Sequence, residues 1–373
     1  MLHARFNRST PRSRVLGVSL VELMVAAAIG LIASIAIFQV FAAFEGQKRT
    51  TAAGGEAQTN GALALFTIER DIRMAGYGIN NLDFLGCTIL GWDEQVGGGT
   101  AFTVQFVPVR ITQGAGSTSG VAGAPDTISV MYGNGELLPN PANLTANMPS
   151  PAAVFKVNNR YGFREGDLVV AAEPGKDCTL AQVSGLPGTP GQTDNVIHNS
   201  GTYTDPNTGV QIPTRYNKPG GLGVAYTTNG KLFNIGSLPQ NNIYAISNAQ
   251  LTLQQMLSAP STAPVAIYDG IVQLQAQYGK DTNGDGVVDV FDEVTPTTPA
   301  GWAQVLAIKL ALVARSGLYE RTEVSPAAIK LWEDSTTPPT TTGPVWTLTA
   351  DERRYRYKVF HTVVPIRNMI WRP

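Results

Sequence analysis

Hydrophobic and polar positions divide the chain into one long apolar segment near its start and a remainder of short, mostly alternating runs. Between Val18 and Phe44 the only charged residue is Glu22. As a helix rising 1.5 Å per residue this segment would be roughly 40 Å long, which is enough to cross the hydrocarbon core of a bilayer. The pattern therefore predicts an apolar transmembrane helix over residues 18–44.

The helix is predicted to continue beyond the membrane as an amphipathic helix over residues 45–76. The glycine pair at 54–55 should weaken it, because each glycine costs about 1 kcal/mol relative to alanine. Gly76 and Gly78 should end it. An apolar stripe at helical spacing supports this continuation and should pack on a sheet; its members are Leu65, Ile68, Ile72 and Ala75.

Residues 77–373 read as one β-rich domain with long loop insertions, so the predicted fold class is α+β. Period-two alternation predicts strands around Ile128-Val130-Tyr132, Val272-Leu274-Ala276, Ile308-Leu310-Leu312 and Tyr355-Tyr357-Val359. Stretches rich in Gly, Pro, Asn and Thr predict loops over 95–125, 133–151, 186–230, 257–265 and 294–300.

Charge and composition narrow the functional classes. The chain carries 27 basic and 28 acidic residues, and this lack of a basic excess argues against nucleic-acid binding. No P-loop, GxSxG, HExxH or paired CxxC motif occurs, and only three histidines are present. The sequence therefore predicts no enzymatic activity.

The first 17 residues form a basic leader without any acidic residue. Basic residues before an apolar span hold the N-terminus in the cytoplasm, so the domain after the helix should be exported to the periplasm. A secretory signal peptide would have a shorter apolar region, with cleavage after it. A plain membrane anchor would give Glu22 no role. The basic residues are Arg5, Arg8, Arg12 and Arg14.

The residues GVSLVEL (17–23) resemble the type III signal of type IV pilins and pseudopilins. The resemblance implies that prepilin peptidase cuts between Gly17 and Val18, and that Val18 is then N-methylated. Phe is the commoner residue there, so Val18 is a small departure. It also implies that Glu22 compensates the N-terminal ammonium of a neighbouring subunit, since two opposite charges buried together cost less than either alone.

Further segments resemble minor pilins of the PilW type, in the same order along the chain: LFTIERDIRMAGYGI (65–79), DTISVMYG (126–133), EGDLVVAAE (165–173), LFNIGSLPQNNIYAISNAQL (232–251), DGIVQLQAQYG (269–279), VLAIKLALVARSG (305–317) and VVPIRN (363–368). This implies a minor pilin that is held in the bacterial inner membrane by a single span and then joins or primes a type IV pilus. Its partners would be other minor pilins and the major pilin, through the N-terminal helix. Two alternatives remain: a J-type minor pseudopilin of type II secretion, and a calcium-dependent adhesin anchored by a pilin helix.

An acidic loop, DTNGDGVVDVFDE (281–293), has the spacing of a calcium-binding loop. Calcium takes six to eight oxygen ligands, and EF-hand-like loops supply them from positions 1, 3, 5, 7, 9 and 12, with Gly at position 6. An acidic turn between strands is the alternative, and Glu293 is an alternative to the shorter Asp292 as the last ligand. The predicted ligands of this structural calcium over 281–292 are Asp281, Asn283, Asp285, the Val287 carbonyl, Asp289 and Asp292.

The chain has two cysteines, Cys87 and Cys178. Disulfides form and persist in oxidising compartments, so export favours a bond between the two. The alternative is that each is buried and unpaired.

Overall fold

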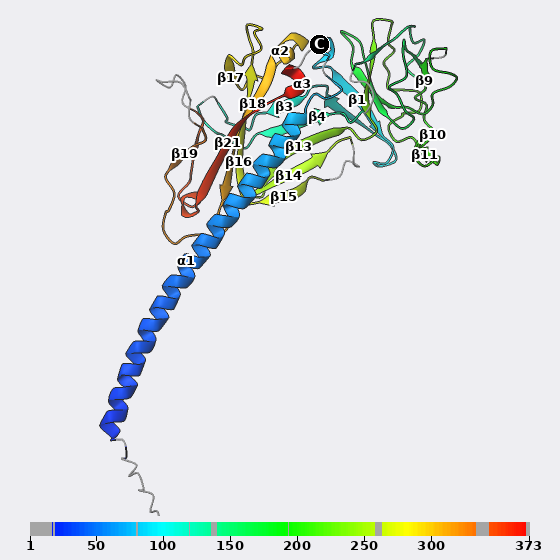
Figure 1. The fold of residues 1–373 in the computed structure, drawn as a ribbon. Helices are drawn as coiled ribbons and strands as arrows, with labels where there is room; N and C mark the ends of the chain where they lie inside the picture. Colours follow the sequence, from blue (N-terminus) through cyan, green and yellow to red (C-terminus); the bar gives the residue numbers. More distant parts are fainter. Residues whose placement is uncertain are drawn as a thin grey trace, which may run out of the picture. The chain divides into compact units, whose positions relative to one another are not determined.

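The computed structural model describes residues 17, 19–79, 81–118, 120–135, 140–192, 194–257, 263–332 and 343–370. Its first element is one long helix, α1 (Leu20–Met74), and the rest is rich in β-strands, so the predicted α+β class is confirmed (Figure 1). The chain divides into two compact units, residues 1–53 and 54–373, and each is described by itself.

Within the second unit, the C-terminal part of α1 buries one face against the strands. Ile68, Ile72 and Ala75 are fully buried and Leu65 packs beside them, which confirms the predicted apolar stripe. The helix ends at Met74 and is followed by two glycines with positive φ, Gly76 at +83° and Gly78 at +77°, a region that side chains other than glycine seldom adopt.

Two sheets form the main core together with this part of α1 (Figure 1). All strand pairs within both sheets are antiparallel. The five-stranded sheet has the order β15 (Val265–Asp269), β14 (Gln250–Gln255), β13 (Gln240–Ser247), β4 (Thr127–Tyr132) and β3 (Val109–Thr112). The four-stranded sheet has the order β17 (Val290–Asp292), β16 (Ile271–Lys280), β18 (Val305–Arg315) and β21 (Tyr357–Pro365).

A six-stranded sheet carries two further clusters of apolar side chains. Its order is β2 (Thr100–Gln105), β1 (Thr88–Asp93), β8 (Cys178–Gln182), β7 (Leu168–Ala172), β12 (Lys231–Gly236) and β5 (Ala142–Asn143). Every residue of β7 is buried, and alternate residues face different clusters: Leu168 and Val170 one, Val169 and Ala171 the other. A strand covered on both faces has a continuous apolar sequence, as β7 does.

Shorter elements complete the fold. They are the pairs β10 (Thr202–Thr204) with β11 (Gln211–Pro213), β6 (Phe155–Lys156) with β9 (Asn195–Val196), and β19 (Ala328–Lys330) with β20 (Val345–Thr347). The short helices are η1 (Leu82–Phe84), α2 (Pro299–Ala303), η2 (Glu352–Arg354) and α3 (Arg367–Ile370).

The predicted loops are wrong in part. Strands β2 and β3 lie within 95–125, β5 lies within 133–151, and β9, β10 and β11 lie within 186–230. The β10–β11 pair buries neither side of its strands and lacks the apolar alternation that marks a strand. Strand β2 does alternate, with Phe102 and Val104 packed against a core cluster, but it follows directly on a Gly-rich run. The last predicted strand begins two residues late, at Tyr357, because Tyr355 caps η2.

A disulfide joins Cys87 to Cys178, with 5.9 Å between their Cα atoms, as predicted. Cys178 opens β8, and it pairs with Ile89 of β1, two residues after Cys87, in the parallel register of these strands. The bond therefore links two neighbouring strands whose cysteines are 91 residues apart.

Asp126 pairs with backbone groups at one edge of β16. Strand β17 pairs with only the last three residues of β16, Tyr278 to Lys280, so the backbone groups before them on this edge have no strand partner there among the described residues. The Asp126 carboxylate accepts the N–H of Ala276 on β16 and the N–H of Gly114, both at 2.8 Å, and its own N–H donates to the Leu274 carbonyl. Burial raises the pKa of Asp126 to about 6, opposed by these two hydrogen bonds.

Replacing both cysteines by serine should lower the free energy of unfolding. Closing a loop with a sequence separation of 91 removes unfolded-state entropy worth about 4–5 kcal/mol in the chain-entropy model, and native bonds typically contribute 2–4 kcal/mol. Urea unfolding of the oxidised chain and of the double serine variant measures the difference. Equal unfolding midpoints would contradict a stabilising role.

Asp126 should make the protein less stable as the pH rises. Its pKa in the folded state, about 6, lies above the ordinary value of 3.8, so between these values the folded chain binds more protons than the unfolded chain. The stability from this group is therefore present below about pH 4 and lost as the pH rises through 6. Unfolding midpoints from pH 4 to 7 should fall more steeply in the wild type than in Asp126→Asn, and parallel curves would contradict this.

Candidate functional site

The N-terminal unit presents a wholly exposed apolar helix. From Leu20 to Phe44 every residue of α1 is exposed to solvent in the isolated chain, and among the described residues α1 is the one helix that is long and apolar enough to cross a membrane. This assignment of a possible membrane span rests on the length and composition of the helix alone. Gly17 lies before the helix, whereas residues 1–16 and Val18 lie outside the described residues, so the predicted leader and cleavage position stay predictions.

Glu22 has a partner at the start of its own helix. The N–H of Ser19 donates to a Glu22 carboxylate oxygen at 3.3 Å, and the N–H of Glu22 donates to the Ser19 hydroxyl at 3.2 Å. This reciprocal pair is a capping box, which satisfies two N–H groups that a helix start leaves unpaired. The Ser-x-x-Glu spacing from Ser19 to Glu22 is the sequence signal of this cap.

At the other end of α1, Asp71 is a buried carboxylate surrounded by donors. It is 1% exposed. One oxygen accepts from the Asn242 amide at 2.6 Å and the Tyr244 hydroxyl at 2.5 Å, and the other accepts from the Tyr132 hydroxyl at 3.2 Å. Arg70, mostly exposed, lies 3.6 Å away. Helix α1 is thus bonded to β13 and β4 through one carboxylate.

The two tyrosines of this cluster are held in their protonated form. Burial, with the charge of Asp71 next, raises the pKa of Tyr132 to about 12 and raises that of Tyr244 further. A protonated hydroxyl can donate to the carboxylate, so both donors remain available at any physiological pH.

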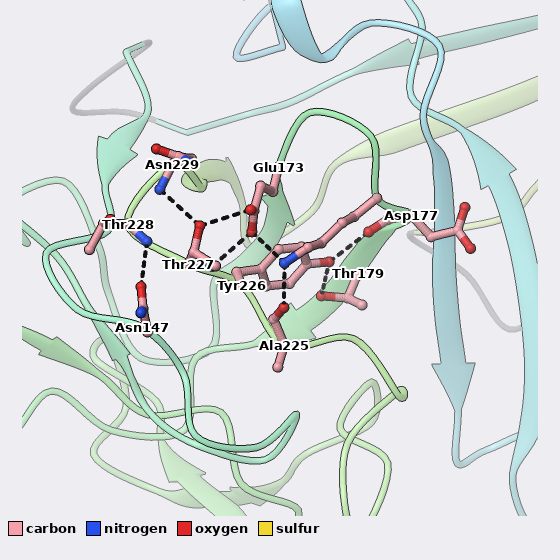
Figure 2. Close-up of polar contacts among 10 residues, drawn as sticks. Asn147, Glu173, Asp177, Thr179, Ala225, Tyr226, Thr227, Thr228 and Asn229 are labelled. Atoms are coloured by element: carbon pink, nitrogen blue, oxygen red, sulfur yellow. Dashed lines mark hydrogen bonds and ion pairs between the residues drawn. The ribbon is translucent and has the colours of Figure 1, made fainter.

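Glu173 organises a second polar cluster, at the turn between β7 and β8 (Figure 2). Its carboxylate accepts the Thr227 N–H and hydroxyl, both at 2.8 Å, and the Lys176 ammonium at 2.9 Å. Burial alone would raise the pKa of Glu173, but these donors outweigh it and lower the pKa. Nearby, the Tyr226 hydroxyl lies 2.9 Å from the Asp177 carbonyl. The protein itself supplies these partners, and together they hold the turn between β7 and β8.

The predicted calcium loop folds around its own carboxylates. Asp281, only 6% exposed, accepts the N–H of Gly284 at 2.6 Å and of Gly286 at 2.8 Å. Both glycines have φ above +80°, as the turn requires. The Asn283 amide lies 3.3 Å from Asp285 and 3.1 Å from Asp289.

Hydrogen bonds from the same loop favour the ionised form of Asp289. Hydrogen bonds from the Thr282 hydroxyl and N–H, and from the Asn283 N–H, lower the pKa of Asp289. The side chains of Asn283, Asp285 and Asp289 therefore lie within hydrogen-bond distance of one another through the Asn283 amide. The Asp281 carboxylate binds backbone N–H groups of the same loop.

The last predicted ligand lies apart from this group. Asp292 is in β17, where its carboxylate is 2.6 Å from the Lys280 ammonium of β16. Val287, whose carbonyl was the other predicted ligand, is exposed. In the described part of the chain, no three His, Cys, Asp or Glu side chains already converge as a metal site. Calcium binding stays a prediction.

In a comparison with known protein families, residues 233–368 match one family model, which is described as type IV pilus-assembly protein W. This segment runs from β12 to α3 and includes the four-stranded sheet. Neither the curated proteins nor the solved structures gave a match. This match supports the resemblance to the PilW type over the motifs that lie in residues 233–368, and it does not cover the prepilin-like signal at residues 17–23.

Replacing Asp71 should destabilise the domain more than any exposed charge on α1. Asp71→Ala leaves two buried donors, Asn242 and Tyr244, and the partly buried Tyr132 hydroxyl without their acceptor. Hydrogen bonds to charged groups contribute about 1.5–3 kcal/mol each, so a loss of roughly 3–5 kcal/mol is expected. Glu69→Ala is the matched control on the same helix: it removes an i,i+4 pair with Arg73 and should cost about 0.5 kcal/mol or less.

Urea unfolding of both variants measures the two costs. Equal losses in Asp71→Ala and Glu69→Ala would contradict the assignment of Asp71 as the group that bonds the helix to the strands.

Proposed function

The match over residues 233–368 supports a PilW-type pilus protein that takes part in type IV pilus assembly, and we propose that this chain is a minor pilin that joins or primes the filament through α1. PilW is a family of pilus-assembly components and not of enzymes. The proposed partners are the major pilin and other minor pilins, with prepilin peptidase acting on the precursor. The family match favours a pilus over a type II secretion pseudopilus.

The observation that carries the proposal is the exposed apolar part of α1. Large apolar side chains such as Leu23, Ile32 and Phe41 are all more than 60% exposed in the isolated chain. Apolar surface on this scale is unfavourable in water and has to be covered by lipid or by other apolar helices. A precursor anchored in the inner membrane and a subunit packed in a helical filament meet this need in turn.

Glu22 has two roles to reconcile in this proposal. Its carboxylate caps its own helix through Ser19 in the isolated chain. In the assembled state we propose that it compensates the N-terminal ammonium of a neighbouring subunit, after cleavage between Gly17 and Val18 and methylation of Val18. The two roles differ chemically, because a glutamine still accepts the capping hydrogen bond but carries no charge.

Calcium is the proposed structural cofactor of the loop at residues 281–292. The hydrogen bonds that gather Asn283, Asp285 and Asp289 support it, as does the fold of the loop around Asp281. Carboxylate, amide and carbonyl oxygens are the donors that calcium takes. Asp292 would join the proposed ligands only if its ion pair with Lys280 opened.

Glu22→Gln and Ser19→Ala separate charge compensation from helix capping. Glu22→Gln keeps the capping acceptor and should reduce piliation strongly, because the neighbour's ammonium is left uncompensated. Ser19→Ala keeps the charge, removes one cap bond costing about 1 kcal/mol, and should leave piliation near the wild-type level. Pili counted by electron microscopy of cells whose own copy is replaced give the readout. Normal piliation with Glu22→Gln would remove the charge argument.

Calcium should raise the melting temperature of the full-length chain in detergent micelles relative to chelator. An ion that binds only the folded state stabilises it by RT ln(1 + [L]/Kd), about 1 kcal/mol for a weak site in millimolar calcium. Asp285→Ala should abolish the shift, and magnesium should substitute poorly because it keeps its water shell. Identical melting with calcium and chelator, together with no heat of binding at millimolar calcium, would reduce the loop to an acidic turn.

A further inference from the structure

One stretch of α1, residues 46–61, is poorly suited to a helix by its composition. A helical glycine lowers the helical population about fivefold relative to alanine, and threonine and asparagine lower it less. In these positions α1 has Gly46, Thr50, Thr51, Gly54, Gly55, Thr59, Asn60 and Gly61.

Tertiary packing does not compensate over residues 46–56. None of them is buried, and the first buried residue of α1 is Ala57. Helices in proteins owe most of their stability to a packed face, so this stretch has neither of the usual sources of helical stability.

The glycines of this region fall into two classes. Gly61 is required by packing, because a Cβ there would overlap the ring of Phe360. At Gly54 and Gly55 a Cβ would meet nothing within 4 Å. No close neighbour accounts for this pair, so the property that distinguishes it from alanine at these positions is the freedom of its backbone.

The helix on each side of residues 46–56 has a source of stability that this stretch lacks. On one side Ala57, Ala64 and Ile68 are buried against the strands of the second unit. On the other side, residues 20–44 form the apolar part, which a bilayer or a bundle of helices would stabilise.

We propose that α1 opens locally at residues 46–56, around Gly54–Gly55, while the helix on either side stays formed. The segment then acts as a bending point that lets the apolar part change direction without unfolding the packed part. Its use in moving between membrane and filament rests on the proposed function, whereas the opening itself does not.

Hydrogen exchange of the full-length chain in lipid nanodiscs tests the opening directly. Amides of residues 47–58 should exchange at least about tenfold faster than those of residues 62–74, because locally unstable segments open without global unfolding. Exchange in 47–58 as slow as in 62–74 would overturn the proposal, whatever the chain does in assembly.

Two variants assign the effect to the glycine pair. Gly54→Ala/Gly55→Ala should slow exchange in 47–58 by about 25-fold, the product of two fivefold factors. Adding Ala52→Gly/Ala53→Gly to that variant moves the pair by two positions at constant composition, and should restore fast exchange. No slowing in the first variant, or no recovery in the second, would overturn the proposal. Melting of the second unit should be unchanged in both, since none of the four positions is buried.

Discussion

The buried carboxylate of Asp71 is the interaction on which the arrangement of the second unit, residues 54–373, depends. A carboxylate that is 1% exposed and has only a mostly exposed arginine at 3.6 Å must be stabilised by hydrogen bonds. Its donors come from β4 and β13, which pair with each other, so Tyr132, Asn242 and Tyr244 reach it only when those strands are in register. The rotation of α1 and the register of the sheet are therefore fixed together.

This constraint divides α1 into parts with opposite needs. The part from Ala57 to Ile72 is anchored by buried side chains and by Asp71. The part from Leu20 to Phe44 is apolar and exposed throughout in the isolated chain, and by length and composition it could cross a membrane. A protein with one anchored and one uncovered apolar half of a single helix is suited to being held in a membrane and then built into an assembly.

The sequence predicted those features that depend on local patterns. The apolar segment, the stripe ending in Ile72 and Ala75, and the strands β4, β16 and β18 all follow from periodicity. The disulfide was predictable because the chain has two cysteines and the sequence predicts export. The acidic loop was recognisable from spacing, although the pairing of Asp292 with Lys280 was not, because it depends on how β16 and β17 pair.

Features that depend on contacts distant in sequence were missed. The partners of Asp71 lie 61, 171 and 173 residues away, so within its own helix it resembled any polar surface residue. Strand β10 was taken for a loop, since pairing and not apolar alternation defines it. Strand β2 does alternate at Phe102 and Val104, but the Gly-rich run before it favoured a loop. The sequence predicts a role for Glu22 between subunits, whereas its bond to Ser19 within the chain was missed.

The central claim is that α1 carries this chain from the membrane into the pilus as a processed subunit. Mass spectrometry of pili sheared from cells and purified away from membranes tests it most directly. The account predicts that this chain is present with an N-terminus at methylated Val18. Absence of the chain from purified pili, with the protein retained in the membrane and its leader intact, would contradict the account.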